Sequence, residues 1–165
     1  MKNITIILAA GSSQRCGFDK LFTSKFGKPF LEQTCDVFEN SPLIDEIVLV
    51  VSKKNKAQAQ KMASLYEKIS TVLTGGSTRF LSLKKAINSL SERENCRIIV
   101  HNGANPKLKI KDLENGIALA EKKKNVIFGF FTTDSIKKVV DGKVETFLDR
   151  EEIFQTQTPQ ISDLE

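Results

Sequence analysis

A regular alternation of short apolar runs with helix-forming segments is the feature that most restricts the fold of this sequence. The apolar runs are continuous, which is typical of strands buried on both faces, and they cover residues 4–9, 47–51, 69–73, 97–101 and 126–132. Helical spacing of apolar residues appears between them, at 29–40, 55–68, 78–90 and 110–123. We therefore expect an α/β fold, with a doubly wound, mainly parallel Rossmann-like sheet and helices on both faces.

The helical segments also predict which side chains face the sheet. The first and third helices are expected to bury apolar residues spaced three and four apart, namely Phe30, Leu31, Thr34, Val37 and Phe38 in the first, and Phe80, Leu83, Ile87 and Leu90 in the third. The second helix carries Ala59, Met62, Ala63 and Tyr66 at the same spacing.

The pattern changes after residue 132. "SIKKVVDGKVETFL" contains two β-prone runs around Asp141-Gly142, which is a hairpin signal. We expect residues 133–155 to form a projecting β-hairpin arm that dimerises the protein. The final "TPQISDLE" has Pro159 near its start, which predicts the opening turn of a helix. The whole chain, residues 1–165, is expected to form a single domain.

Composition limits the possible partners. No apolar run reaches the roughly 18 residues that a membrane span needs, so no membrane partner is expected. The net charge of +5 suits an anionic partner. The lysines are dispersed without interleaved aromatics, so no nucleic-acid partner is expected, and a small phosphorylated substrate fits the charge equally well. Three widely spaced cysteines indicate a reducing, cytoplasmic location, and a single histidine argues against a zinc site.

Parallel sheets bind ligands outside the carboxyl ends of their strands, and three strand-end loops here are unusual. The first, "LAAGSSQRCGFDK", combines the small residues Ala9, Ala10 and Gly11 with the cations Arg15 and Lys20. Small residues let a ligand approach the backbone, and the cations suit phosphate. The spacing alone is equally typical of an ordinary strand-to-helix connection.

The other two loops are individually ambiguous. "TGGSTRFLSL" places two glycines before Ser77 and Thr78, which predicts a tight turn and a helix N-cap and also leaves helix N–H groups at the ligand edge. "HNGANP" begins with His101, for which a buried core position bonded to the backbone is the favoured interpretation. Asn102 and Asn105 have the side chains to bind a ligand or to shape turns.

In this order, the motifs resemble those of the cytidylyltransferases of the non-mevalonate isoprenoid route, which make 4-diphosphocytidyl-2-C-methyl-D-erythritol from CTP and 2-C-methyl-D-erythritol 4-phosphate. "LAAGSSQRCGFDK" is similar to the family's nucleotide loop, "GGSTRFLSLKKAI" to its GG-x-x-R-x-x-S motif and "VHNGANP" to its H-D-x-A-R-P motif. "TTDSIKKV" resembles its D-T-x-K segment and "LDREEIFQTQTPQ" its D-R-x-x-L-x-x-x-Q-T-P-Q motif.

The resemblance implies a role for individual residues. Arg15 and Lys20 would be catalytic, lying on the triphosphate and stabilising the pentavalent transition state. Ser135 and Arg150 would bind the acceptor's phosphate in the site of a neighbouring subunit, which makes a homodimer part of the design. The residues that would bind the nucleotide are Ala9, Ala10, Gly11, Ser12, Gly76, Ser77, Ser82 and Ala104.

Two positions depart from the family pattern. Asn102 replaces the family's metal-binding Asp, and Asn105 replaces its Arg. An amide brings no negative charge, so Asn102 predicts a weakened Mg²⁺ site. The family's chain also continues further, and we expect this chain to lack that C-terminal part. Three alternatives stay open: a ribitol-5-phosphate cytidylyltransferase, another sugar-phosphate nucleotidyltransferase, or a non-catalytic nucleotide-binding and dimerisation module.

Overall fold

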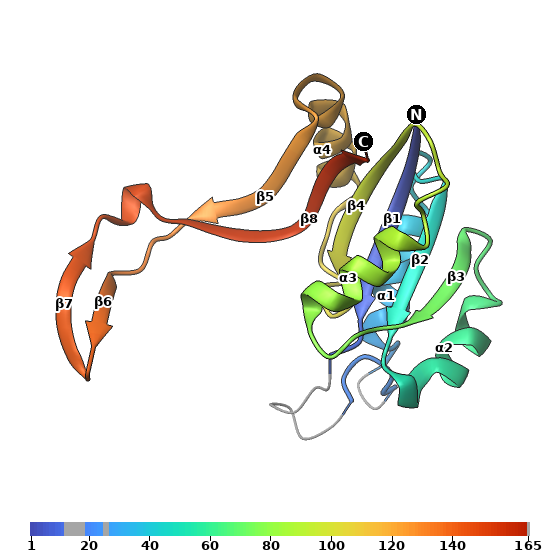
Figure 1. The fold of residues 1–165 in the computed structure, drawn as a ribbon, viewed down its shortest axis with the longest axis horizontal. Coiled ribbons are helices and arrows are strands. Elements are labelled where there is room, and N and C mark those ends of the chain that lie inside the picture. Colours follow the sequence, from blue (N-terminus) through green and yellow to red (C-terminus); the bar gives the residue numbers. More distant parts are fainter. Residues whose placement is uncertain (12–18, 25–26, 165) are drawn as a thin grey trace.

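A six-stranded sheet with the strand order β3-β2-β1-β4-β8-β5 forms the centre of the molecule (Figure 1). The computed structural model describes residues 1–11, 19–24 and 27–164. The strands of the sheet are β1 (Lys2–Ala9), β2 (Glu46–Val51), β3 (Ile69–Thr74), β4 (Cys96–Asn102), β5 (Asn125–Phe131) and β8 (Phe154–Leu164). β1 to β4 are parallel, and β8 runs antiparallel to both of its neighbours. The predicted doubly wound, mainly parallel sheet is confirmed.

Helices cover both faces of this sheet, as predicted. The helices are α1 (Phe30–Glu39), α2 (Lys56–Ala63), α3 (Arg79–Asn88) and α4 (Ile110–Lys123), with short 3-10 turns η2 (Lys53–Asn55) and η3 (Arg150–Glu152). α1, α2 and α4 pack on one face, and α3 packs on the other. Each face of the sheet has its own cluster of buried apolar side chains. Successive residues of β2 point into opposite clusters, because side chains alternate along a strand.

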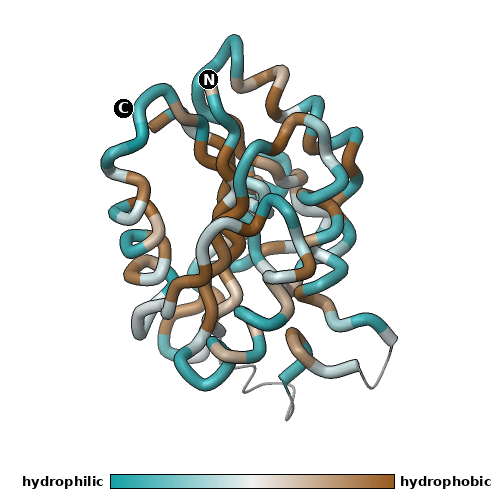
Figure 2. Tube along the Cα trace, turned by 90° about the vertical axis from the view of Figure 1, so that its right-hand side faces the viewer, coloured by the Kyte–Doolittle hydropathy of each residue, from teal (hydrophilic) through white to brown (hydrophobic). Residues whose placement is uncertain are grey.

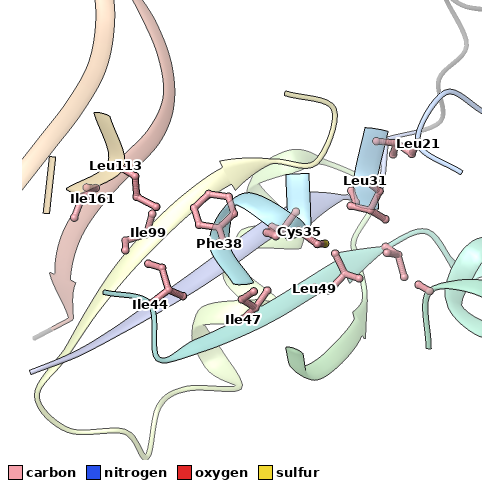
Figure 3. Close-up of a cluster of buried hydrophobic side chains, with 14 of the residues drawn as sticks. Leu21, Leu31, Cys35, Phe38, Ile44, Ile47, Leu49, Ile99, Leu113 and Ile161 are labelled. Carbon is pink, nitrogen blue, oxygen red and sulfur yellow. The ribbon is translucent and has the colours of Figure 1, made fainter. Parts of the chain in front are cut away.

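The apolar core follows the sheet. Figure 2 shows the hydrophobic residues concentrated along the central strands, with hydrophilic residues outside. Figure 3 shows Leu31, Cys35 and Phe38 of α1 in one row above the sheet, and all three are fully buried. None of the helices in the described part of the chain is both long and apolar enough to span a membrane.

Two aromatic residues predicted to be buried are exposed. Phe30 is 38% exposed and Phe80 is 70% exposed, because other residues of each helix face the sheet. Cys35 takes a core position on α1, while α3 buries the small residues Ser82 and Ala86. The second helix is also shorter than predicted, since α2 ends at Ala63.

The predicted helical turn at the end of the chain is wrong, because residues 154–164 form strand β8. β8 lies between β4 and β5 and supplies backbone partners to both, which a helix cannot do. Pro159 falls where the pairing with β5 shifts register, so its missing N–H interrupts no regular ladder. Thr158, Pro159 and Ile161 are buried there.

The predicted arm is a separate two-stranded sheet formed by β6 (Ile136–Val140) and β7 (Lys143–Leu148). Asp141 and Gly142 form its turn with φ of 49° and 75°, as a two-residue hairpin turn of type I′ requires. Figure 1 shows the arm projecting from the sheet beyond β5 and β8. Its apolar side chains include Val139, Val144 and Phe147, which are 57%, 51% and 71% exposed.

Candidate functional site at the carboxyl edge of the sheet

The loops that follow β1, β3 and β4 meet at one edge of the sheet. These strands are parallel, so their carboxyl ends share an edge, which lies at the bottom of Figure 1. β2 and β3 lie on one side of β1 and β4 on the other, so the strand order changes direction between β1 and β4. Ligands of open α/β sheets bind at such a switch point.

Two glycines allow the three loops to touch. A Cβ on Gly75 would lie 2.5 Å from the Cβ of Ala10, and a Cβ on Gly103 would lie 3.0 Å from the Cβ of Ala9. The Gly75 N–H donates to Val51 O at 2.9 Å, and the Gly103 N–H donates to Leu8 O at 2.9 Å. The alanines of the first loop therefore lie between the second and third loops, so these three predicted motifs form one surface.

The second loop is held by its own side chains. Thr78 caps α3 as predicted, because its Oγ1 accepts from the Leu81 N–H at 3.1 Å. Ser82 is 3% exposed, and its Oγ accepts from the Gly76 N–H at 3.0 Å and donates to Thr78 O at 2.9 Å. Ser82 thus shapes the turn, and its role toward the nucleotide stays a prediction. Ser77 is exposed at the start of α3.

His101 is the core histidine that the sequence predicts. Its ring is fully buried, it packs edge-on against Phe38 with 5.1 Å between ring centroids, and its Nε2 donates to Asn105 O at 2.9 Å. Burial lowers the pKa of the imidazole from 6.5 to about 4, and the backbone hydrogen bond opposes this only in part. The ring is therefore neutral at pH 7 and is no general acid or base for chemistry at the surface.

Asn102 ends β4 and is exposed at the edge, while Ala104 is half-buried nearby. The Asn102 N–H donates to Thr158 Oγ1 at 3.4 Å, and Asn102 O accepts from the Asn105 N–H at 3.0 Å. The residues are thus arranged as a turn that leaves the Asn102 side chain at the surface.

Carboxylates are the ligands that would hold Mg²⁺ strongly. Across the described ranges, no three His, Cys, Asp or Glu residues gather in a way that could hold a metal ion. Asn102 contributes one neutral amide oxygen. This donor set fits a protein-held Mg²⁺ poorly, and the magnesium dependence stays a prediction.

The structure describes only part of the first loop, including Lys20. Ser12 and Arg15 lie outside the described residues, and Gly11 is exposed. Lys20 is half-buried beside Asp19, whose carboxylate accepts from the Asn55 side chain at 2.7 Å. The sequence analysis missed Asp19 and Asn55. In the sequence, Asp19 could have been noticed only because it precedes Lys20. Its contact with Asn55 joins positions 36 residues apart, so no local pattern indicates it.

Ser135 and Arg150 are exposed at the two ends of the arm hairpin. Figure 1 shows the arm leaving the molecule away from the edge where the three loops meet. Within one chain, the structure does not bring these two residues to the loops. Their predicted role in a neighbouring subunit's site stays a prediction.

Known proteins were compared with this chain by sequence and by fold. The profile of the family "IspD: 2-C-methyl-D-erythritol 4-phosphate cytidylyltransferase" matches residues 3–165. The enzyme of that name from Clostridium acetobutylicum is 36% identical over 164 residues, which cover 96% of this chain and 71% of the relative. Its counterpart from Dehalococcoides mccartyi is 34% identical over 161 residues, covering 94% and 70%.

Solved structures agree with the sequence comparison. The 4-diphosphocytidyl-2C-methyl-D-erythritol synthase of Anaerococcus prevotii superimposes with a TM-score of 0.83 at 27% identity, covering 98% of this chain and 70% of that one. The 2-C-methyl-D-erythritol 4-phosphate cytidylyltransferase of Francisella tularensis gives a TM-score of 0.77 at 29% identity, covering 98% and 72%. With the profile match over residues 3–165, these similarities show that the chain belongs to the 2-C-methyl-D-erythritol 4-phosphate cytidylyltransferase family.

Proposed function

We propose that this protein transfers CMP from CTP to 2-C-methyl-D-erythritol 4-phosphate and releases pyrophosphate. Membership of the family supports the reaction. The observation that carries the proposal is the contact of Ala9 and Ala10 with Gly103 and Gly75, which joins the three motif loops at the switch point of the sheet. Small residues at these contacts let the backbones of the three loops lie close together at the edge where a nucleotide would bind.

The reaction needs no acid–base pair. An oxygen of the acceptor's phosphate attacks the α-phosphorus of CTP in line, the new P–O bond forms, and the bond from the α-phosphorus to the bridging oxygen breaks. Pyrophosphate carries that oxygen and the electron pair away. Catalysis by positioning and charge stabilisation suits this step. The buried, neutral His101 takes no part.

Lys20 and Arg15 supply the charge in this proposal. Lys20 lies at the end of the first loop and is half-buried, and a lysine ammonium offers phosphate a mobile point charge. Arg15 enters from the family resemblance alone. If Mg²⁺ accompanies CTP, the triphosphate would have to supply most of its ligands and Asn102 would offer one neutral amide oxygen, and no step of the reaction is assigned to the metal.

The arm supports a homodimer in this proposal. An isolated two-stranded hairpin is marginally stable in water, and this one exposes Val139, Val144 and Phe147. A second copy that covers these side chains would stabilise the arm and bring Ser135 and Arg150 to the partner's loops. We also place the protein in the cytoplasm, because the buried Cys35 and Cys96 are free thiols.

Pyrophosphate release by the purified protein tests the proposal. CTP, UTP and ATP are each offered with 2-C-methyl-D-erythritol 4-phosphate and with ribitol 5-phosphate, with and without Mg²⁺. We expect release with CTP and methylerythritol phosphate at a kcat/KM at least about 100-fold above the other pairs. Preference for ribitol 5-phosphate would move the function to the related cytidylyltransferase, and CTP binding without any turnover would indicate a non-catalytic module.

A further inference from the structure

We propose that Asn55 is a positioning residue that holds the carboxylate of Asp19 away from Lys20 and so keeps the Lys20 ammonium free for phosphate. The inference rests on the proposed function in one respect, which is that Lys20 contacts the triphosphate. The new element is Asn55 itself. It lies in the segment between β2 and α2 and, in this inference, keeps the Asp19 carboxylate from neutralising the Lys20 ammonium.

The contacts of Asp19 occupy both oxygens of its carboxylate. Asn55 is 8% exposed, and its Nδ2 donates to Asp19 Oδ2 at 2.7 Å. The Lys54 ammonium lies 3.5 Å from the same oxygen. Asp19 Oδ1 accepts from the Leu21 N–H at 3.2 Å. The carboxylate is thus turned toward the start of α2.

The backbone on both sides of Lys20 is fixed as well. Asp19 O accepts from the N–H groups of Phe22 and Thr23 at 3.3 and 3.1 Å. Leu21 is 4% exposed, and its carbonyl accepts from the Leu31 N–H at 3.2 Å. Lys20 therefore sits between two anchored residues. In the part of the chain that the structure describes, the Lys20 ammonium has no ion-pair partner.

A carboxylate next to a phosphate-binding lysine can weaken phosphate binding in two ways if nothing else binds it. Once free, it pairs with the ammonium or repels the triphosphate, since opposite charges attract and like charges repel strongly in a partly buried site. Asn55 satisfies the carboxylate with a neutral donor and is itself held by the hydrogen bond from its own N–H to Ser52 O at 3.1 Å. A nearly buried amide therefore bonds the carboxylate of the residue that precedes Lys20.

A purely structural role for Asn55 predicts different behaviour. Loss of a buried hydrogen bond would lower stability and would leave the ratio between the KM values for CTP and for the acceptor unchanged. Loss of positioning would raise the KM for CTP selectively, and removal of the Asp19 charge would reverse the effect. The double variant therefore separates the two roles.

The experiment compares Asn55→Ala, Asp19→Asn and the double variant with the wild-type protein, in steady-state pyrophosphate release and in calorimetric titration with CTP. Ser70→Ala is the matched control, because it removes another part-buried hydrogen bond, 2.6 Å from Ser70 Oγ to Glu46 Oε1, away from the first loop. Thermal unfolding is measured for every variant. Asn55→Ser, a polar substitution that lacks the Nδ2 donor to Asp19, takes the place of Asn55→Ala if the latter does not fold.

We expect Asn55→Ala to raise the KM and the Kd for CTP about tenfold, as loss of one charge contact does, with the acceptor KM within twofold. The double variant returns to within about threefold of wild type, and Ser70→Ala stays within twofold in both KM values. Wild-type activity with an unchanged CTP affinity in Asn55→Ala, or no recovery in the double variant, overturns this inference alone. A wild-type protein that neither binds nor turns over CTP overturns the proposed function and this inference with it.

Discussion

At the scale of single residues, Gly75 determines how closely the first and second loops approach. Gly75→Ala would place a methyl group 2.5 Å from the Cβ of Ala10 and 2.8 Å from Ser82 Oγ, so the loops must move apart. We expect kcat/KM for CTP to fall about tenfold or more, because small displacements in a binding site cost that much. Adding Ala10→Gly removes one of the two clashes. Recovery of part of the CTP affinity in the double variant would confirm the contact, and an unaffected Gly75→Ala protein would contradict it.

Lys20 is the described residue expected to contribute most to turnover. Lys20→Ala removes a charge that stabilises the transition state, so we expect kcat to fall by a factor on the order of 10² to 10⁴. Lys28→Ala is a suitable control, because Lys28 forms a surface ion pair with Asp36 and such pairs contribute little. Turnover by Lys20→Ala equal to that of the control would remove Lys20 from the mechanism.

His101 should make the stability of the fold depend on pH. Burial lowers the pKa of His101 to about 4 in the folded protein, against 6.5 for the unfolded reference. Between these values the unfolded chain binds more protons, so stability is full above pH 6.5 and falls as the pH drops toward 4. Urea unfolding should show a loss of about 2 kcal/mol between pH 7 and pH 5 from this residue.

His101→Phe gives the control for this prediction. A phenyl ring preserves a ring against Phe38 and cannot be protonated, so its loss of stability between pH 7 and pH 5 should be smaller by about the same 2 kcal/mol. Equal pH dependence in the two proteins would show that His101 is not the titrating group.

At the scale of elements, the Thr132 hydroxyl helps to join the two chain segments at the root of the arm. Thr132 is 4% exposed, and its Oγ1 accepts from the Gln155 side chain at 2.8 Å and from the Asp134 N–H at 3.2 Å. Its N–H donates to Ile153 O at 3.0 Å. These bonds join the two chain segments from which the β6–β7 hairpin departs, and so they fix the direction of the arm.

Thr132→Val removes the hydroxyl at nearly constant volume. Both hydrogen bonds to the hydroxyl are lost. If the arm supplies Ser135 and Arg150 to the acceptor's phosphate, the acceptor KM should rise about fivefold, which corresponds to about 1 kcal/mol, while the KM for CTP stays unchanged. Thr146→Val on the exposed strand β7 is the control. Equal effects on both KM values would show that Thr132 does not act through the arm.

The elements differ in how far the sequence predicts them. Apolar runs such as "IVLVV" identify buried strands locally, and Asp141-Gly142 identifies the hairpin, because both signals lie within a few residues. β8 cannot be predicted in this way, because its polar sequence forms a strand only through pairing with β4 and β5. The exposed Phe80 shows the same limit: helical spacing predicts an apolar face, and tertiary packing decides which residues of the helix are buried.

In the site, too, the sequence predicts some features and leaves others to tertiary packing. The carboxyl edge follows from the parallel sheet, so the sequence predicts where the three loops gather. The contact of Gly75 with Ala10 and the hydrogen bond of Asn55 to Asp19 are set by tertiary packing. No spacing in the sequence signals either of them.

At the scale of the whole molecule, the fold separates two tasks. The central sheet gathers the loops for the nucleotide at one edge, and the arm carries its predicted acceptor contacts away from that edge (Figure 1). A homodimer reconciles this separation, because the arm of one copy can reach the loops of another. The active unit that we propose is therefore a pair of chains in which the arm of each completes the nucleotide edge of the other.

The most direct test of the central claim is a ³¹P NMR spectrum of the purified protein with CTP, 2-C-methyl-D-erythritol 4-phosphate and Mg²⁺. CMP transfer predicts that the resonances of CTP decline while those of a new diphosphate diester and of free pyrophosphate rise together in equal amounts. A spectrum in which CTP remains intact, or in which inorganic phosphate rises and no diester forms, would contradict CMP transfer at this edge of the sheet.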